Sequence, residues 1–338
     1  MGVLADSLLV FSADVFSSLL SVVFGEGVMQ VEEELARLSP EKDTLLAIGV
    51  FDGVHLGHKS LLSRLTEMAG RESLLSGVVT FHPHPREVLL HAPDLVYLTT
   101  IDEKVDLLRK EGVEAVVTLS FTPELAQLPA CSFVTLLQKH LRMRGMVVGP
   151  DFALGRDREG DVDVLVALGR ELDFSVNVIP EVTTNGDVIS STTIRNALID
   201  GNIKQATKLL GRAYSLQGEV TTGAGRGAGL GFPTANLAVD PKKALPPEGV
   251  YVTWAYLEGQ RYQSMTNIGR RLTFGEKELT IEVLLMDYQD NLYGRELRID
   301  IVERLRDEKR FNSVDELKRQ IAADIEQGRA ILSLQVRE

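Results

Sequence analysis

The stretch AIGVFDGVHLGH at residues 47–58 is the most informative feature of the chain. It joins an apolar run at residues 45–51 to a glycine-containing turn, and then to a segment with helical spacing at residues 56–68. A short apolar run between polar residues is typical of a strand buried on both faces of a parallel sheet. The turn is therefore expected at the carboxyl end of that strand, where sheets of this kind bind ligands.

This turn has the residue types needed to hold a nucleoside triphosphate. Gly53 and Gly57 let the backbone approach a ligand closely, and the amides that begin the following helix can bind phosphate. His55 and His58 are three residues apart, so both side chains would point the same way from the first helical turn. Two imidazoles there can stabilise charge that develops on phosphorus during a transfer reaction. An isolated HxxH pattern is, however, more often two polar residues at a helix start.

Two further polar segments follow apolar runs and so also belong at strand ends: TFHPHP at residues 80–85 and GPDFALG at residues 149–155. In the first, two prolines remove backbone donors and stiffen the loop. A metal site built on His82 and His84 has little support, because no third His or Cys stands at ligand spacing. In the second, Asp151 is a candidate for positioning Mg²⁺ or a flavin, although a Pro-Asp pair after a strand is more often a plain turn.

A run of hydroxyls, ISSTTIR at residues 189–195, precedes an amphipathic segment that ends at Gly201. This is the pattern of a capped helix with a glycine stop. The hydroxyls and free amides of its first turn, with Arg195 one turn further in, would also hold the β- and γ-phosphates of ATP. An N-cap alone also accounts for the hydroxyls.

The spacing of apolar residues predicts an α/β domain followed by a β-barrel. Apolar runs alternate with helix-period stretches through residues 45–179, which predicts a doubly wound parallel sheet. After Tyr214 a period of two takes over between close glycines and prolines, which predicts a small Greek-key β-barrel. A terminal helix is expected from Ser313, with Ser313 and Glu316 as a capping box. The apolar face that would pack against the barrel consists of Val314, Leu317, Ile321 and Ile325.

The bulk properties limit the compartment and the partners. The chain has 338 residues, enough for two domains, and its formal net charge of -12 argues against a nucleic-acid backbone as partner. Its single cysteine, Cys131, excludes an internal disulfide, so the cytoplasm is the expected compartment. The side chain of Cys131 is expected in the core. The apolar residues 8–24 are too short and too polar for a membrane span, and no Lys or Arg precedes them as a secretory signal requires.

A glycine run at residues 223–231, GAGRGAGLG, introduces a second candidate site. Its amides can fold around phosphates, but it is neither a Walker A loop nor a strict GxGxxG, and such a run alone is more often a mobile loop. GFPTAN at residues 231–236 follows directly, and its hydroxyl and amide oxygens suit a hard cation such as Mg²⁺. Further on, Glu282 taken alone would be a solvated strand carboxylate.

Together these motifs resemble one family. FDGVHLGH is similar to the signature of the HxGH nucleotidyltransferase superfamily. With PHP, GPDF and ISSTTIR in this order, it resembles the adenylyltransferase module of the bacterial bifunctional riboflavin kinase/FMN adenylyltransferases, or FAD synthetases. GFPTAN resembles the riboflavin kinase signature. The resemblance continues to about residue 338 through GVY at 249–251, NIG at 267–269, TFG at 273–275, IEV at 281–283, LYG at 292–294 and LRDEKRF at 305–311.

The resemblance implies an enzyme that phosphorylates riboflavin to FMN with ATP and then adenylylates FMN to FAD, releasing pyrophosphate, with Mg²⁺ as cofactor. His55, His58 and Arg195 would offset charge in the second step, and Glu282 would be the general base of the first. The implied ATP-binding residues are Gly49, Phe51, Asp52, Gly53, Gly57, Ser190, Ser191, Thr192, Gly225, Arg226, Gly231, Phe232 and Pro233. The implied flavin-binding residues are His84, Pro85, Asp151, Phe152 and Arg306, and the implied metal ligands are Thr234 and Asn236.

Some positions depart from the family pattern, and two alternatives follow. Ala228, Leu272 and Leu284 replace residues common in the kinase; we expect an active kinase, and an adenylyltransferase whose kinase domain has decayed is the alternative that these departures raise. Leu154 replaces an aromatic residue of the first domain. The other alternative is a flavin- or nucleotide-binding regulator without turnover. The retained Glu282 argues against it, because a pure binder needs no general base.

The resemblance also suggests the domain boundaries. In the family the first strand begins much nearer the start of the chain than Thr44, so Met29 is a plausible initiator. Residues 1–28 would be an extension with no assigned function. An adenylyltransferase domain is expected at residues 29–205 and a riboflavin kinase domain at residues 206–338.

Overall fold

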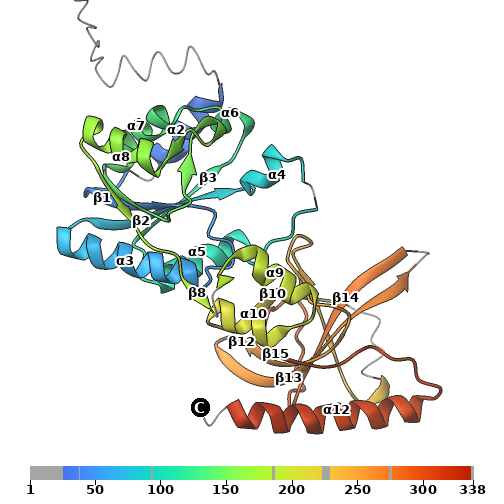
Figure 1. Cartoon of the computed structure of the whole chain (residues 1–338). Helices are drawn as coiled ribbons and strands as arrows, with labels where there is room; N and C mark the ends of the chain where they lie inside the picture. Colours follow the sequence, from blue (N-terminus) through green and yellow to red (C-terminus); the bar gives the residue numbers. More distant parts are fainter. Residues whose placement is uncertain are drawn as a thin grey trace, which may run out of the picture. The chain divides into compact units, whose positions relative to one another are not determined.

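The structure is a computed structural model that describes residues 26–37, 39–92, 94–184, 187–222, 229–273 and 276–335. These residues form two compact units (Figure 1). The first unit comprises the described parts of Met1–Leu95 and Ile101–Thr183, and the second comprises those of Val96–Thr100 and Thr184–Glu338. The chain therefore passes between the units more than once.

The first unit is built on a five-stranded sheet with the order β3-β2-β1-β4-β7. Its strands are β1 Thr44–Ile48, β2 Leu75–His82, β3 Ala115–Ser120, β4 Met143–Val148 and β7 Ser175–Val178. All neighbouring strands pair in parallel, which confirms the predicted parallel sheet. The strand order reverses between β1 and β4. The segments that leave these two strands therefore flank the switch point at which such sheets bind ligands.

Helices cover both faces of this sheet. They are α2 Glu26–Ala36, α3 Leu56–Glu72, α4 Pro85–Leu89, α5 Ile101–Lys110, α6 Pro123–Ala126, α7 Ala130–Leu141 and α8 Val162–Leu172. Leu46 and Ile48 of β1 share a core cluster with residues of α2, α6, α7 and α8. Leu45 and Ala47 share another with residues of α3 and α5. Alternate residues of one strand thus bury against opposite helical layers, which confirms the doubly wound arrangement.

Helix α2 begins at Glu26, continues past Met29, and is anchored by Val31 and Leu35, which are almost completely buried. One detail of this unit differs from what the sequence suggested. Cys131 is the second residue of α7 and is only half-buried, so the expectation of a core cysteine is wrong. Burial and the nearby Glu171 carboxylate raise the pKa of its thiol.

The second unit contains a closed antiparallel barrel with the order β10-β11-β14-β13-β12-β15, which confirms the predicted barrel. Its strands are β10 Tyr214–Thr221, β11 Ala235–Val239, β12 Gly249–Leu257, β13 Gln260–Thr273, β14 Glu276–Leu285 and β15 Glu296–Arg306. Two helices, α9 Ser191–Ile199 and α10 Ile203–Leu210, precede it. Side chains alternate along β12: Tyr251 and Ala255 are fully buried, whereas Val250 and Trp254 cluster with Leu332 of the last helix.

The last helix, α12, spans Val314–Gln335 and packs along the barrel (Figure 1). The predicted cap is present with one change: Ser313 Oγ accepts from the Glu316 amide at 3.1 Å, and the Glu316 carboxylate accepts from the amide of Asn312 instead of Ser313. The prediction for Val314 is wrong, because its side chain is 56% exposed. It lies in the first turn, before the apolar face reaches the barrel.

The remaining elements are short. They are β5 Ala153–Leu154, the 3₁₀ helix Arg156–Arg158, β6 Gly160–Asp161, β8 Thr183–Thr184 and β9 Asp187–Val188. Within the described residues, no helix has the length and apolar character that a membrane crossing requires.

Candidate active sites

The turn between β1 and α3 has a strained backbone. Phe51 and Val54 have φ angles of 51° and 37°, a left-handed conformation that is unfavourable for side chains of this size. Gly53 between them has a φ of 82°, which glycine adopts freely. The Val54 amide donates to the Phe51 carbonyl at 3.1 Å, and a Cβ at Gly49 would lie 3.2 Å from the Phe51 ring. The turn thus folds back on the end of β1, and Asp52 within it is 2% exposed.

The two histidines lie together where α3 begins. His55 is the N-cap, and its Nδ1 accepts a hydrogen bond from the His58 amide at 3.3 Å. The two imidazoles stack with 3.6 Å between ring centroids, and Gly57 lies in the helical turn that joins them. Because Nδ1 of His55 accepts, Nε2 carries the proton in the neutral ring and can donate to a ligand. The predicted helix start and the shared direction of the two histidines are both confirmed.

The PHP segment also ends in a helix cap. His84 is the N-cap of α4, its Nδ1 accepts from the Arg86 amide at 3.0 Å, and Pro85 begins the helix, where a missing donor costs nothing. His82 is exposed. Among the described residues, no group of three or more His, Cys, Asp or Glu is arranged to hold a metal ion. The metal interpretation of this segment therefore gains no support.

Asp151 and Phe152 follow β4 at the other side of the switch point. The Phe152 amide donates to the Gly149 carbonyl at 3.3 Å, which closes a turn. Phe152 is half-buried against the core of the unit, whereas Asp151 is exposed. The segment can therefore be both a turn and part of a site, because the turn leaves the Asp151 carboxylate accessible to a ligand.

The ISSTTIR segment belongs to the second unit. Ser190 caps α9, with Oγ accepting from the Thr193 amide at 3.2 Å, and Arg195 is 8% exposed. Ser191 is half-buried and Thr192 is exposed in the first turn. The predicted capped helix is confirmed. The joint action of Arg195 with the two histidines stays a prediction, because the histidines lie in the first unit.

Glu282 lies in a row of polar residues across three strands of the barrel. Asn236 of β11 and Asn267 of β13 are both directly opposite Glu282 of β14. Residues directly opposite one another project from the same face of a sheet. Ala235 and Val283, the neighbours on the other face, are buried. The predicted base and one predicted metal ligand are thus side by side.

A cavity of about 500 Å³ adjoins this row. Its lining includes Thr234, Asn267, Glu282, Arg306, Leu317 and Ile321. The barrel strands contribute both polar and apolar side chains to the lining, and α12 contributes mainly apolar ones. A cavity of this size and composition suits a small molecule that has an apolar part and a polar part.

The loop before β11 borders the same cavity. Phe232 lines it, and Pro233 and Thr234 line a smaller cavity of about 150 Å³ next to it. Gly231 has a φ of 87°, so a larger residue would be strained there. The predicted ATP-binding residues Gly225 and Arg226, like the departures Ala228 and Leu272, fall where backbone or side chain lies outside the described residues.

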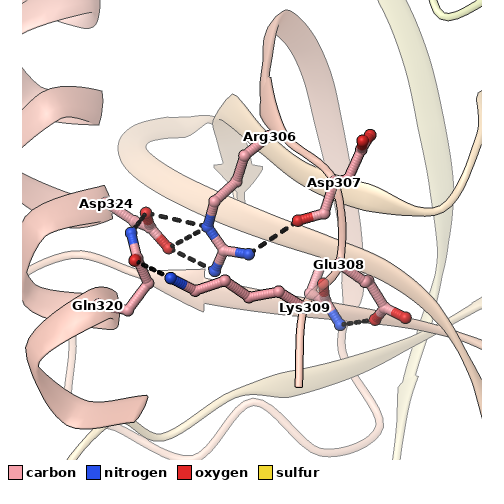
Figure 2. Close-up of polar contacts among 7 residues, drawn as sticks. Arg306, Asp307, Glu308, Lys309, Gln320 and Asp324 are labelled. Carbon is pink, nitrogen blue, oxygen red and sulfur yellow. Dashed lines mark hydrogen bonds and ion pairs between the residues drawn. The ribbon is translucent and has the colours of Figure 1, made fainter. Parts of the chain in front are cut away.

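Figure 2 shows how Arg306 ties the end of β15 to α12. Its Nε and Nη2 bind the carboxylate of Asp324, with a shortest distance of 2.7 Å, and its Nη1 donates to the Asp307 carbonyl at 2.9 Å. Gln320 donates to the Asp324 carboxylate at 2.8 Å, and Lys309 donates to Gln320 at 2.6 Å. Arg306, a predicted flavin contact, therefore holds the edge of the cavity through contacts within the protein.

The sequence analysis assigns no role to two residues of this site, although Asn267 belongs to one of its motifs. Asn267 donates to the Glu308 carboxylate at 3.0 Å and so connects the polar row to the segment after β15. Asp324 is 6% exposed and is the partner of Arg306. Its sequence signal is an acidic residue between Ile321 and Ile325, on the face of α12 that is otherwise apolar.

The fold and the two sites together define a class of protein, in which a doubly wound α/β unit with two histidines at a helix start is joined to a closed barrel with a carboxylate beside a cavity. The sequence profile of the FAD synthetase family matches residues 38–193, and that of the riboflavin kinase family matches residues 210–332. These two matches cover most of the chain. The chain belongs to the bifunctional riboflavin kinase/FMN adenylyltransferase family.

Individual relatives agree with this assignment. The bifunctional riboflavin kinase/FMN adenylyltransferase of Listeria monocytogenes is 35% identical over 86% of this chain and 92% of its own length. The enzyme of the same name from Escherichia coli K12 is 38% identical over 85% of this chain and 92% of its own length. A crystal structure described as a macrolide-efflux protein from Streptococcus pneumoniae has a TM-score of 0.81 and 33% identity, over 89% of this chain and 97% of that one. The whole fold, with both units, is therefore shared with a solved structure.

Proposed function

We propose that this chain phosphorylates riboflavin to FMN and then adenylylates FMN to FAD, using ATP in both steps. Family membership supports the two activities. The observation that supports the first most directly is the row of Asn236, Glu282 and Asn267 beside the cavity. A general base next to two amide side chains, in a cavity that also has apolar lining, is an arrangement that can bind a flavin and activate its hydroxyl.

In the kinase step, Glu282 accepts the proton of the terminal ribityl hydroxyl. The oxygen of that hydroxyl attacks the γ-phosphorus of ATP, the bond from this phosphorus to the β–γ bridging oxygen breaks, and ADP leaves. Leu317 and Ile321 of α12 provide an apolar surface for the isoalloxazine ring. Glu282 is half-buried, so water is partly excluded from the base.

Thr234 and Asn236 fit the magnesium ion that such a step requires. A hydroxyl and an amide oxygen are hard ligands that Mg²⁺ accepts together with phosphate oxygens and water. Thr234 lines the cavity, and Asn236 is opposite Glu282. When bound, Mg²⁺ would offset the negative charge of the phosphates.

In the adenylylation step, a phosphate oxygen of FMN attacks the α-phosphorus of ATP and pyrophosphate leaves. The amides at the start of α3 and the imidazoles of His55 and His58 lie at the carboxyl end of β1, where they can stabilise the developing charge. Arg195 is assigned to the same task through its motif. The predicted cytoplasmic location and the functional boundary between residues 205 and 206 stay predictions.

Chromatography of reaction products tests this function and separates it from its rivals. With riboflavin, ATP and Mg²⁺, the protein should yield FMN and then FAD. Conversion of added FMN to FAD without any FMN from riboflavin would support the decayed-kinase alternative. Flavin binding with no conversion of either substrate would support the regulator.

Replacing the proposed base tests the division of labour. Glu282→Gln should lower FMN formation by about 10²-fold or more, because the amide cannot accept the proton, while added FMN is still adenylylated. The matched control is Glu296→Gln in β15, an exposed glutamate whose loss should leave both rates unchanged. Equal loss of both activities in the Glu282 variant would contradict the assignment.

A further inference from the structure

Helix α5 carries a buried lysine that none of the motifs includes. Lys104 is 4% exposed, and with Leu108 one turn later it forms the buried face of the helix. A fully buried lysine is rare unless a specific set of partners holds it. Its position on an apolar face therefore calls for an explanation in terms of its contacts.

The ammonium of Lys104 contacts the carboxyl end of β2. Nζ donates to the Thr80 hydroxyl at 3.3 Å and to the Phe81 carbonyl at 3.4 Å. The Thr80 hydroxyl in turn donates to the Val50 carbonyl at 3.0 Å. Thr80 is fully buried, so this chain of hydrogen bonds is shielded from water. It joins α5 to the ends of both β2 and β1.

Val50 is the residue before the strained turn. Phe51 and Val54 hold positive φ angles, and such conformations persist only where the surrounding structure fixes them. The Lys104–Thr80–Val50 chain fixes the backbone at the point where the turn begins. The turn leads directly to His55 at the cap of α3.

The charge of Lys104 is maintained at a cost. Burial lowers the pKa of its ammonium from 10.5 to about 8, and the charge of Asp52 in the strained turn acts in the opposite direction. Since the unfolded chain binds this proton more tightly, the lysine opposes folding at neutral pH, and that penalty declines as the pH rises from about 8 towards 10.5. A group kept at the expense of stability beside a site is a candidate for function.

We propose that Lys104 is a positioning residue for adenylyl transfer, which acts through Thr80 and Val50 on the turn that presents His55 and His58. This inference rests on the proposed FMN adenylyltransferase activity. Lys104 needs no contact with substrate in this role. It holds the turn in the conformation in which the first amides of α3 and the two imidazoles face the same ligand.

The test replaces the ammonium and keeps an apolar stem. Lys104→Met should lower kcat for FAD formation from FMN at least tenfold with little change in KM for ATP, because the pocket remains while its geometry loosens. FMN formation from riboflavin should be unchanged. The midpoint of thermal unfolding should not fall, because the variant removes a buried charge. Lys104→Arg, which retains charge and donors, should recover part of kcat.

The matched control is Lys110→Met, an exposed lysine of the same helix, which should leave every readout unchanged. If wild-type protein forms no FAD from FMN, the proposed activity itself fails. If wild type is active and Lys104→Met keeps kcat within twofold, the positioning role is overturned. It is also overturned if kcat falls only in parallel with the unfolding midpoint and returns at lower assay temperature, since a purely structural brace predicts that result.

A second variant tests whether Lys104 acts through the Thr80 hydroxyl. Thr80→Val removes the hydroxyl that Lys104 and Val50 share. If Lys104 acts through this hydroxyl, the double variant should be no slower than the slower single variant. Multiplicative losses in the double variant would refute the route through Thr80.

Discussion

Three side chains that the sequence predicts to contact ligands are also helix caps. His55 caps α3, His84 caps α4 and Ser190 caps α9, each by accepting a hydrogen bond from an amide of the first helical turn. For the two histidines this contact uses Nδ1 and leaves Nε2 for other partners. The sequence leaves open whether each residue is a helix cap or a binding residue. The structure shows that the two roles are compatible. In our proposal the cap orients the side chain that acts on the ligand.

These two roles of His55 can be separated by substitution. His55→Asn keeps a good N-cap, whereas His55→Ala should lose about 1 kcal/mol of stability with the cap. Both should lower FAD formation by about 10²-fold, because neither retains an imidazole. Denaturant unfolding gives the stabilities, and chromatography of FAD gives the rates. An active His55→Asn variant would show that the histidine is only a cap.

At the scale of elements, α12 closes the kinase cavity because two different contacts hold it to the barrel. Along its second half, Leu332 is fully buried in the cluster with Trp254. At Gly328 the helix comes so near β13 that a Cβ would lie 2.5 Å from the sulfur of Met265. Near the cavity the attachment is instead ionic, through Arg306 and Asp324.

The ionic attachment should matter more than a surface ion pair of the same helix. Asp324→Asn leaves the guanidinium of Arg306 without its counter-charge in a largely buried place, so we expect a loss of about 2 kcal/mol and a higher KM for riboflavin. Asp287→Asn removes the exposed partner of Arg329 and should cost less than about 1 kcal/mol. Urea unfolding and kinase kinetics of both variants provide the comparison, and equal effects would rule out the special role of Asp324.

At the scale of the whole molecule, the compact units do not follow the order of motifs. Helices α9 and α10 belong to the same unit as the barrel, although the ISSTTIR motif at the start of α9 completes the adenylyltransferase set. Leu209 and Leu210 of α10 are buried, and Lys204 bonds to Glu303 of β15 at 3.4 Å. Val96–Thr100 is a further part of this unit, because the Tyr97 amide donates to the Lys242 carbonyl at 2.7 Å.

This grouping predicts how the barrel tolerates truncation. A fragment of residues 184–338 should be more stable than one of residues 206–338, by about 2 kcal/mol or more, because the shorter fragment lacks α9 and begins inside α10, so that the remaining residues 206–210 no longer belong to a complete helix over the barrel. The kinase activity of the longer fragment should also survive to higher urea concentration. Unfolding curves of the two fragments measure the difference. Equal midpoints would mean that α9 and the first half of α10 contribute nothing to the barrel unit.

Much of the fold follows from short-range patterns. The five parallel strands, the capped helix at residue 191, the barrel and the capped terminal helix all come from apolar periods and turn residues, which act over a few positions. The wrong predictions also concern single residues. Val314 fits the apolar period of α12 but is exposed, because a period identifies a helical face and not the point at which another element begins to cover it.

The candidate sites divide in the same way. Short-range patterns are enough to predict that two histidines begin a helix after a buried strand, and that a threonine, an asparagine and a glutamate belong to the second half of the chain. The three-dimensional fold was needed to show that Asn236 and Asn267 both lie opposite Glu282, that Asp324 binds Arg306, and that Lys104 donates to Thr80. The physical reason is that strand register and buried polar contacts join residues far apart in the chain, and their free energy comes from packing and desolvation of the whole fold.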